Sequence, residues 1–346
     1  MRFAAILISV ALILGGIFIL RSYNKTTENL QKPFVFKINS TPVVSSSPIP
    51  FFEMTIPYLK GREYKSKLGE LKVYSENSNY TSYLTSYSSD DLKIYGLLTK
   101  PTGEMPMGGW PTLIFVHGYI PPTLYQTTEK YVEYVDFLAK NGFVVFKIDL
   151  RGHGDSEGDP GGAYYSPDYI IDVLNAYSAL EAEDFVGKIG LWGHSMAGNV
   201  VVRSLAGKPQ IPAVVIWAGA VYSYEDFVKY RLSDNSYRPP ELSSQRQKRR
   251  QELFSAHGEF NKNNVFWKQV APTNYLEDIK GAIQIHHAIN DDVVNIGYSR
   301  DLIKLLDQTS ISHELFEYQS GGHNIIGSSF TTAMTRTVEF FKKYLQ

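Results

Sequence analysis

The hexapeptide Gly193-His194-Ser195-Met196-Ala197-Gly198 constrains this chain more than any other stretch. The apolar run 188–192 precedes it and the helix-compatible run 199–205 follows it, so the sequence predicts a strand, a tight turn and a helix. A G-x-S-x-G turn in this context holds a serine hydroxyl exposed above a parallel sheet, where it can act as a nucleophile. Ala197 departs from the pattern, because glycine is expected there and follows only at 198.

Short apolar segments and helical patterns alternate around this motif. Strands are predicted at 112–116, 143–148, 188–192, 213–217, 282–287 and 314–318, and helices near 129–140, from 166, 199–205, 298–307 and 331–345. Ahead of them, Tyr- and Leu-rich segments at 70–74, 80–87 and 92–98 predict antiparallel strands at the sheet edge. The fold class is therefore α/β, with a mostly parallel sheet and helices on both faces. Between about 221 and 280 the alternation lapses, and this charged, aromatic stretch predicts a helical lid insertion.

Residues 1–50 differ in composition from the rest of the chain. The 18 residues Phe3–Leu20 carry no charge, and a helix of this length spans about 27 Å, enough for a bilayer core. No small-residue cleavage site follows, so residues 1–20 are predicted to be an uncleaved transmembrane anchor in preference to a cleaved signal peptide. The Ser-, Thr- and Pro-rich residues 21–50 predict a linker, and residues 51–346 a single catalytic domain. Basic residues flank the anchor on both sides, and we expect the domain outside the cytoplasm because long domains translocate largely regardless of such charges.

Charge and composition exclude several other classes. The net charge is −1, which gives no footprint for nucleic acid, and the basic run 245–250 is expected to be a solvated helix face. The absence of cysteine removes disulfides and thiolate chemistry. His286 and His287 lie close to two aspartates, but adjacent strand residues point to opposite faces and cannot chelate together. No metal or cofactor is therefore expected.

A nucleophilic serine needs a base and an orienting acid. On a strand–turn–helix of this kind, the acid and then the histidine follow the serine along the chain. Asp291 follows the predicted strand 282–287 in a D-x-x-V pattern, and Asp292 is the alternative acid. Of the two histidines beyond them, His323 lies in a Gly-Gly loop after the last strand, whereas His313 precedes that strand. The predicted triad is Ser195, Asp291 and His323.

Two loops complete the predicted site. An oxyanion hole needs two preorganised N–H groups, for which the candidates are the amides of Met196, after the serine, and Tyr119, in the loop after the strand 112–116. The glycine-rich run 149–158 predicts a tight loop beside the same edge, in which Arg151 and Asp155 make structural hydrogen bonds.

Together these motifs resemble the α/β-hydrolase superfamily, and within it the catalytic domain of the prolyl oligopeptidase family, which includes dipeptidyl- and acylaminoacyl-peptidase-like members. The resemblance runs from about residue 80 to the C-terminus and is carried by the runs 92–98, 116–119, 149–158, 193–198, 287–294 and 321–323. It implies serine hydrolysis through an acyl-enzyme. The chain departs from the family at Ala197 and in the region before residue 110, where about 60 residues are too few for a β-propeller.

The resemblance implies a peptidase that acts on short peptides or amides. A carboxylesterase or lipase-like esterase is the alternative, since the lid is aromatic and the anchor would hold the enzyme near lipid. A more remote alternative is a binding protein with the same fold and no activity; the presence of serine, acid and histidine speaks against it. The sequence predicts no oligomeric state.

Overall fold

Nine strands form one sheet within residues 49–232 and 244–346, the part of the chain that the computed structural model describes. Their order is β1-β2-β3-β5-β4-β6-β7-β8-β9. Pairing is antiparallel from β1 to β5 and parallel from β5 to β9. The strands are β1 (Lys72–Glu76), β2 (Tyr80–Ser89), β3 (Leu92–Pro101), β4 (Trp110–Val116), β5 (Val144–Ile148), β6 (Val186–His194), β7 (Ala213–Trp217), β8 (Ala282–Ala288) and β9 (His313–Tyr318).

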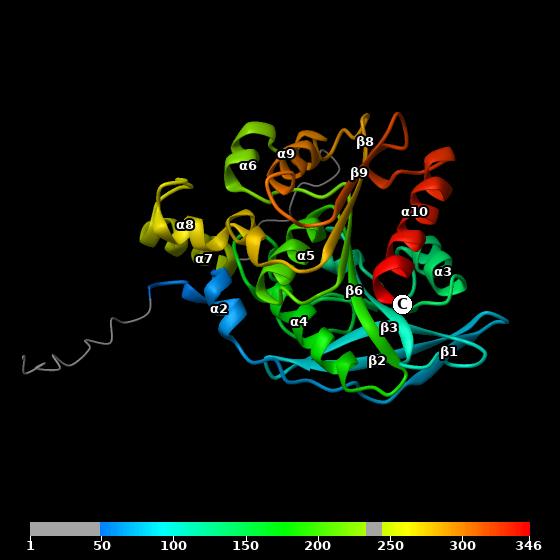
Figure 1. Cartoon of the computed structure of the whole chain (residues 1–346). Coiled ribbons are helices and arrows are strands. Elements are labelled where there is room, and N and C mark those ends of the chain that lie inside the picture. The colour runs from blue at the N-terminus through cyan, green and yellow to red at the C-terminus, as the bar shows by residue number, and fades with distance from the viewer. Residues whose placement is uncertain (1–48, 233–243) are drawn as a thin grey trace, which may run out of the picture. The chain divides into compact units, whose positions relative to one another are not determined.

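Helices flank this sheet on both faces (Figure 1). They are α2 (Ile56–Gly61), α3 (Val132–Lys140), α4 (Asp168–Glu181), α5 (Met196–Gly207), α6 (Tyr224–Tyr230), α7 (Ser244–His257), α8 (Val265–Val270), α9 (Gly297–Leu306) and α10 (Ser328–Leu345). In Figure 1, α3 and α10 lie on one side of the sheet, and α4, α5 and α9 lie on the other. The predicted α/β class and mostly parallel sheet are confirmed.

Strand β4 shows why the parallel strands are apolar throughout. Ile114 and Val116 pack into the core beneath α4 and α5, while Leu113 and Phe115 pack into a second core with α3 and α10. Because both faces of the strand are buried, every position favours an apolar residue and the alternation of a half-exposed strand is lost. The two cores meet at the sheet, and the loops beyond its carboxyl edge are left to carry polar groups.

A third apolar cluster joins the region predicted as a lid to the start of the described chain. Met54 packs with Leu253 of α7 and Trp267 of α8 in this cluster. The predicted region 221–280 contains α6, α7 and α8, with residues 233–243 outside the described part. Its role as a lid stays a prediction.

The predicted anchor, residues 1–20, and all but the last residues of the linker, 21–50, lie outside the described residues. Within 49–232 and 244–346, we find no helix with both the length and the apolar character needed to span a bilayer. The anchor and the expected extracytoplasmic location therefore stay predictions. Ile49–Gln346 forms one compact unit, and its first residue lies close to the predicted domain start at residue 51.

Candidate active site

Ser195 lies on the turn between β6 and α5. Its backbone has φ 56° and ψ −119°, a conformation that side-chain-bearing residues rarely adopt and that is found where a site requires it. A Cβ built on Gly193 would lie 2.8 Å from the Ala197 carbonyl oxygen, and one on Gly198 would lie 2.7 Å from the Cα of Gly219. Both positions therefore need glycine. Ala197, the departure from the motif, is fully buried in α5.

The structure brings Ser195, His323 and Asp291 together. His323 Nε2 lies 2.9 Å from Ser195 Oγ, and His323 Nδ1 lies 2.9 Å from Asp291 Oδ2. His323 follows β9, Asp291 follows β8 and Ser195 follows β6, and these three strands are parallel neighbours in the sheet with only β7 among them. Because parallel strands end at the same edge, residues more than a hundred positions apart meet there.

Asp291 is held as an ionised carboxylate. Its Oδ1 accepts hydrogen bonds from the amides of Val293 and Val294, both at 2.9 Å, and its side chain has no exposed surface. Burial alone would raise the pKa of Asp291, but hydrogen bonds from His287, His323 and the Val294 amide outweigh it and hold that pKa well below its usual range.

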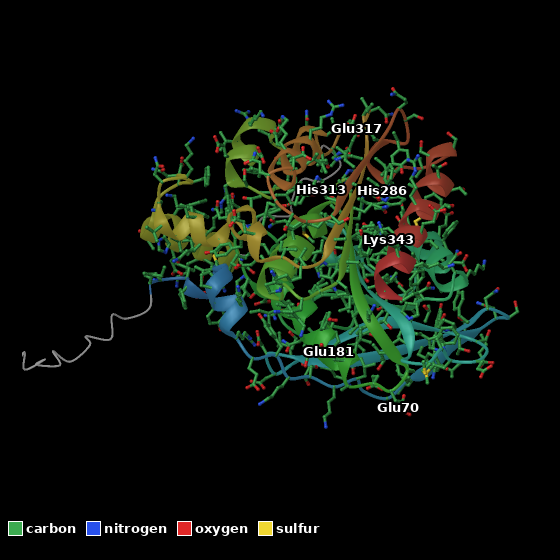
Figure 2. All side chains as sticks on the ribbon, viewed as in Figure 1. Glu70, Glu181, His286, His313, Glu317 and Lys343 are labelled. Atoms are coloured by element: carbon green, nitrogen blue, oxygen red, sulfur yellow. The ribbon has the colours of Figure 1, made fainter. Side chains whose placement is uncertain are left out.

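The two alternatives weighed from the sequence occupy other places. Asp292 is exposed, and the carboxylate that His323 contacts is that of Asp291. His313 begins β9, at the edge of the parallel sheet opposite Ser195, and its Nε2 lies 2.9 Å from Asp307. Figure 2 shows His313 and His286 on the neighbouring strands β9 and β8.

His287 is a supporting residue whose part the sequence did not reveal. Its Nε2 lies 2.9 Å from the Val294 carbonyl oxygen and 3.2 Å from Asp291 Oδ2, and its Nδ1 lies 2.7 Å from Ser299 Oγ. His286 contacts Tyr318 and Gln284 instead. The two histidines thus serve opposite faces of β8, as strand alternation predicts. The one feature of the sequence that could have indicated this contact is the position of His287, four residues before Asp291.

The two residues predicted to supply the oxyanion hole lie in different elements near Ser195. Met196 is the first residue of α5, and Tyr119 lies in the loop after β4. A cavity of about 460 Å³ opens above Ser195 and His323, and Tyr119, Ile120, Val293 and Ile326 are among its lining residues. The roles of both amides in binding an oxyanion stay proposals.

Lys147 of β5 and Asp149, which follows β5, hold the loop that contains Tyr119. Lys147 Nζ donates to the carbonyl oxygens of Thr127 and Lys130, and Asp149 accepts from the hydroxyls of Tyr125 and Thr127. Burial lowers the pKa of Lys147 to about 8 and raises that of Asp149 to about 6. These two buried groups thus fix the stretch 125–130 of the 15-residue connection 117–131. Gly118 and Tyr119 of the same connection line the cavity at Ser195.

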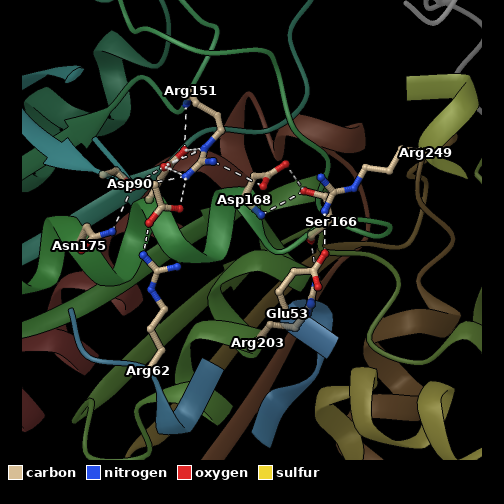
Figure 3. A network of polar contacts seen from close by, with 11 residues as sticks. Glu53, Arg62, Asp90, Arg151, Ser166, Asp168, Asn175, Arg203 and Arg249 are labelled. Atoms are coloured by element: carbon tan, nitrogen blue, oxygen red, sulfur yellow. Dashed lines mark hydrogen bonds and ion pairs between the residues drawn. The ribbon is translucent and has the colours of Figure 1, made fainter. Parts of the chain in front are cut away.

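Arg151 makes the structural hydrogen bonds that the sequence predicts for it in the glycine-rich loop 149–158. The guanidinium of Arg151 donates to the buried Asp172, at 2.7 Å for the shortest contact, and lies 3.4 Å from Asp90 and 3.5 Å from Asp168 (Figure 3). Asp155 is exposed on the same loop. An Arg151 held by several carboxylates fixes this loop beside the strand ends.

Comparison with known proteins gives the class. The family described as "Serine aminopeptidase, S33" matches residues 111–239. Human Protein ABHD12B is 28% identical over 96 residues, and the match spans 28% of this chain and 25% of that protein. The chain thus has the α/β-hydrolase fold, as predicted.

Several solved structures are similar to this chain in fold. Acetyl xylan esterase 1 from Thermoanaerobacterium sp. JW/SL YS485 superposes with a TM-score of 0.58 at 19% identity, covering 82% of this chain and 90% of its own. The acylaminoacyl peptidase of Pyrococcus horikoshii superposes with a TM-score of 0.57 at 19% identity, covering 77% of this chain and 42% of its own. The solved structures that share this fold thus include both peptidases and esterases.

Proposed function

We propose that this chain hydrolyses acyl substrates through an acyl-enzyme on Ser195, with His323 as general base and Asp291 as the orienting acid. The observation that carries the proposal is the continuous contact from Ser195 Oγ through His323 to Asp291, at 2.9 Å for each step. A base within about 3 Å of the nucleophile, oriented by a third group, is the arrangement that nucleophilic catalysis requires.

The proposed reaction proceeds in two halves. His323 Nε2 takes the proton from Ser195 Oγ as the oxygen bonds to the substrate carbonyl carbon, and the amides of Met196 and Tyr119 bind the oxyanion. The protonated His323 then donates to the leaving group, whose bond to the carbonyl carbon breaks. A water molecule, deprotonated by His323, then attacks the carbonyl carbon of the acyl-enzyme. The bond from this carbon to Ser195 Oγ breaks, His323 returns the proton to Ser195 Oγ, and the acid is released. Asp291 holds His323 Nδ1–H and stabilises the imidazolium.

The substrates we propose first are short peptides or amides, as the resemblance to peptidase domains implies. The match to the serine aminopeptidase family supports this choice, because it covers β4, the loop at Tyr119 and the Ser195 turn. Esters are the second candidate. The observation in their favour is that the acetyl xylan esterase is covered over 90% of its length, whereas the acylaminoacyl peptidase is covered over 42%.

A fluorophosphonate probe on the full-length protein tests the nucleophile. We expect wild type to be labelled at Ser195 and Ser195→Ala not to be labelled. Ser66→Ala, which alters a half-buried serine whose hydroxyl donates to the Ser88 carbonyl oxygen, should be labelled like wild type. Equal labelling of wild type and Ser195→Ala, or none of either, would overturn the assignment. Turnover of an aminoacyl amide and of a short acyl ester then separates the two substrate classes, since ester turnover without amide turnover removes the peptidase proposal.

A further inference from the structure

Three turns around the proposed nucleophile have left-handed backbone at residues that bear side chains. Ser195 has φ 56°, Tyr131 at the start of α3 has φ 59°, and Ile325 after His323 has φ 50°. Such a backbone conformation is strained at a residue that bears a side chain, and it persists only where its surroundings fix it. The three turns belong to different parts of the chain, so contacts between them must supply that fixation.

A chain of hydrogen bonds links these turns. The Gly118 amide lies 2.9 Å from the hydroxyl oxygen of Tyr131, and this oxygen lies 2.7 Å from Nδ1 of His194. His194 Nε2 lies 3.0 Å from the backbone carbonyl oxygen of His323. The chain therefore runs from the loop that holds Tyr119, through the residue before the nucleophile, to the loop of the proposed base.

The direction of each bond follows from its partners. A carbonyl oxygen only accepts, so His194 Nε2 carries the hydrogen and donates to His323. Burial and the neighbouring His323 lower the pKa of His194 to about 3, so the ring is neutral and its Nδ1 is an acceptor. Tyr131 thus donates its hydroxyl hydrogen to His194, and its oxygen accepts from the Gly118 amide. Every donor has one acceptor, and only one tautomer of His194 fits.

Two further observations show that the residues around this chain of hydrogen bonds are closely packed. A Cβ on Gly118 would lie 2.8 Å from the Tyr131 hydroxyl and 3.0 Å from His194 Nδ1, so a side chain there would displace the bonded pair. Tyr134, one turn into α3, donates to the carbonyl oxygen of Asn324 at 2.8 Å. The start of α3 thus holds the base loop at two consecutive residues, through His194 at His323 and directly at Asn324.

We propose that Tyr131 and His194 are positioning residues. They hold three segments in a fixed arrangement: the loop after β4 that contains Tyr119, the turn at Ser195 and the loop that contains His323. The inference rests on the proposed function of Ser195 and His323. Neither residue takes or gives a proton in the reaction. Their effect is on the placement of the Tyr119 amide and of the His323 ring, where a displacement of about 1 Å can cost about 100-fold in rate.

Removing one oxygen tests this proposal. In the full-length protein, Tyr131→Phe leaves the Gly118 amide and His194 Nδ1 without the hydroxyl, and we expect kcat for a p-nitrophenyl ester to fall by about tenfold or more with KM nearly unchanged. The matched control is Tyr80→Phe, which also removes a hydroxyl bonded to α3, at Asp136 (2.8 Å), away from the site loops. It should keep the wild-type kcat, and both variants should unfold at similar temperatures.

Substitutions of His194 give a second, independent test of the proposal. His194→Gln keeps one acceptor and one donor, whereas His194→Leu keeps neither, so kcat should be retained better in the glutamine variant. The proposal is overturned if Tyr131→Phe has the wild-type kcat, if its loss matches that of Tyr80→Phe, or if the glutamine and leucine variants lose kcat equally. Fluorophosphonate labelling of the wild type separates this result from the proposed function. An unlabelled wild type removes the nucleophile and with it the inference, whereas a labelled wild type beside an unaffected Tyr131→Phe removes the positioning role alone.

Discussion

At the scale of single residues, Asp291 and Asp292 show how position decides chemistry for one side-chain type. Both follow β8, and the sequence alone kept both as candidate acids. The carboxylate of Asp291 is buried and accepts from two amides and from His323, while Asp292 is exposed to solvent. A buried carboxylate with this many donors stays ionised, which is the state that an orienting acid needs.

The first prediction compares these two neighbours. Asp291→Asn replaces an acceptor with an amide that cannot hold His323 Nδ1–H in the same way, and kcat should fall by about 10⁴-fold, the loss seen when a triad histidine is left in the wrong tautomer. Asp292→Asn removes one charge from the same loop and should keep kcat near the wild-type value. Steady-state kinetics on one ester substrate give both results, and a larger loss for Asp292→Asn would reverse the assignment.

At the scale of elements, the sequence predicted the strands better than the connections. Parallel strands buried on both faces leave continuous apolar runs, so 213–217 was predicted at the observed bounds of β7 and 188–192 lies inside β6 (Val186–His194). Helices α2 and α8 have six residues each, too few for a clear helical period. Ser195, Asp291 and His323 could be chosen as candidates because each of them follows a strand that the sequence predicts.

No pattern in the sequence indicates the hydrogen bond between Tyr131 and His194. Tyr131 and His194 are 63 positions apart, and their hydrogen bond exists only because the loop after β4 folds back over the Ser195 turn. The support of Asp291 by His287 and of the loop 117–131 by Lys147 likewise depends on the three-dimensional path of loops. Periodicity reveals which face of an element is buried, but it carries no information about which polar partner a loop will meet.

The second prediction concerns the anchor of the loop 117–131. Burial raises the pKa of Asp149 to about 6, above its ordinary value near 4, so the folded state binds a proton between pH 4 and 6 that the unfolded state has released. This contribution to stability is fully present below about pH 4 and is lost as the pH rises through about 6. Over that interval it amounts to about 3 kcal/mol, at about 1.4 kcal/mol for each pKa unit.

Asp149→Asn removes this titration while it keeps the size of the side chain. The difference in the free energy of unfolding between wild type and variant, measured in urea at pH 4, 5, 6 and 7, should therefore shift in favour of the variant as the pH rises. The exposed Asn263 is the control, because Asn263→Ala removes no ionisable group and should give a difference that does not change with pH in this interval. A pH-independent difference for Asp149→Asn would contradict the buried, proton-binding carboxylate.

The third prediction concerns Arg203, the fully buried cation of α5. Arg203 donates to the carbonyl oxygens of Ala163 at 3.1 Å, Ser166 at 3.0 Å and Met54 at 2.6 Å, and so joins two connecting segments to the helix that follows Ser195. Figure 3 shows Arg203 and Ser166. Arg203→Leu leaves three buried carbonyls without this donor, and the free energy of unfolding should fall by about 3 kcal/mol or more.

Arg249 provides the comparison for Arg203 within the same region. Its pair with Glu53 spans 3.3 Å, and both side chains are about 40% exposed. Solvent weakens such a pair, so Arg249→Gln should change the free energy of unfolding by less than about 1 kcal/mol. Urea denaturation of the two variants measures both values. Similar losses for Arg203→Leu and Arg249→Gln would show that burial does not distinguish the two arginines.

At the scale of the whole molecule, the sheet divides the apolar interior into two cores, and the segment 49–61 closes one of them. Ile56 and Leu59 of α2 are fully buried in the core beneath α4 and α5, and Met54 is fully buried in the cluster with α7 and α8. This segment lies far in sequence from the site, yet its Met54 carbonyl is a partner of Arg203. It therefore belongs to the folded unit, although its first two residues lie within the predicted linker 21–50.

The last prediction sets the boundary of that unit. Residues 49–346 should unfold cooperatively and keep the kcat of the full-length protein, because all the residues of the proposed site and both cores lie within them. Residues 62–346 lose three buried side chains worth about 1.5–3 kcal/mol each, a loss of the same order as the whole stability of a domain, about 5–15 kcal/mol. Thermal unfolding followed by circular dichroism, with ester turnover as the second readout, should give a sharp transition for 49–346 and none for 62–346. Equal midpoints for the two would place the boundary after α2 and make the segment 49–61 part of the linker.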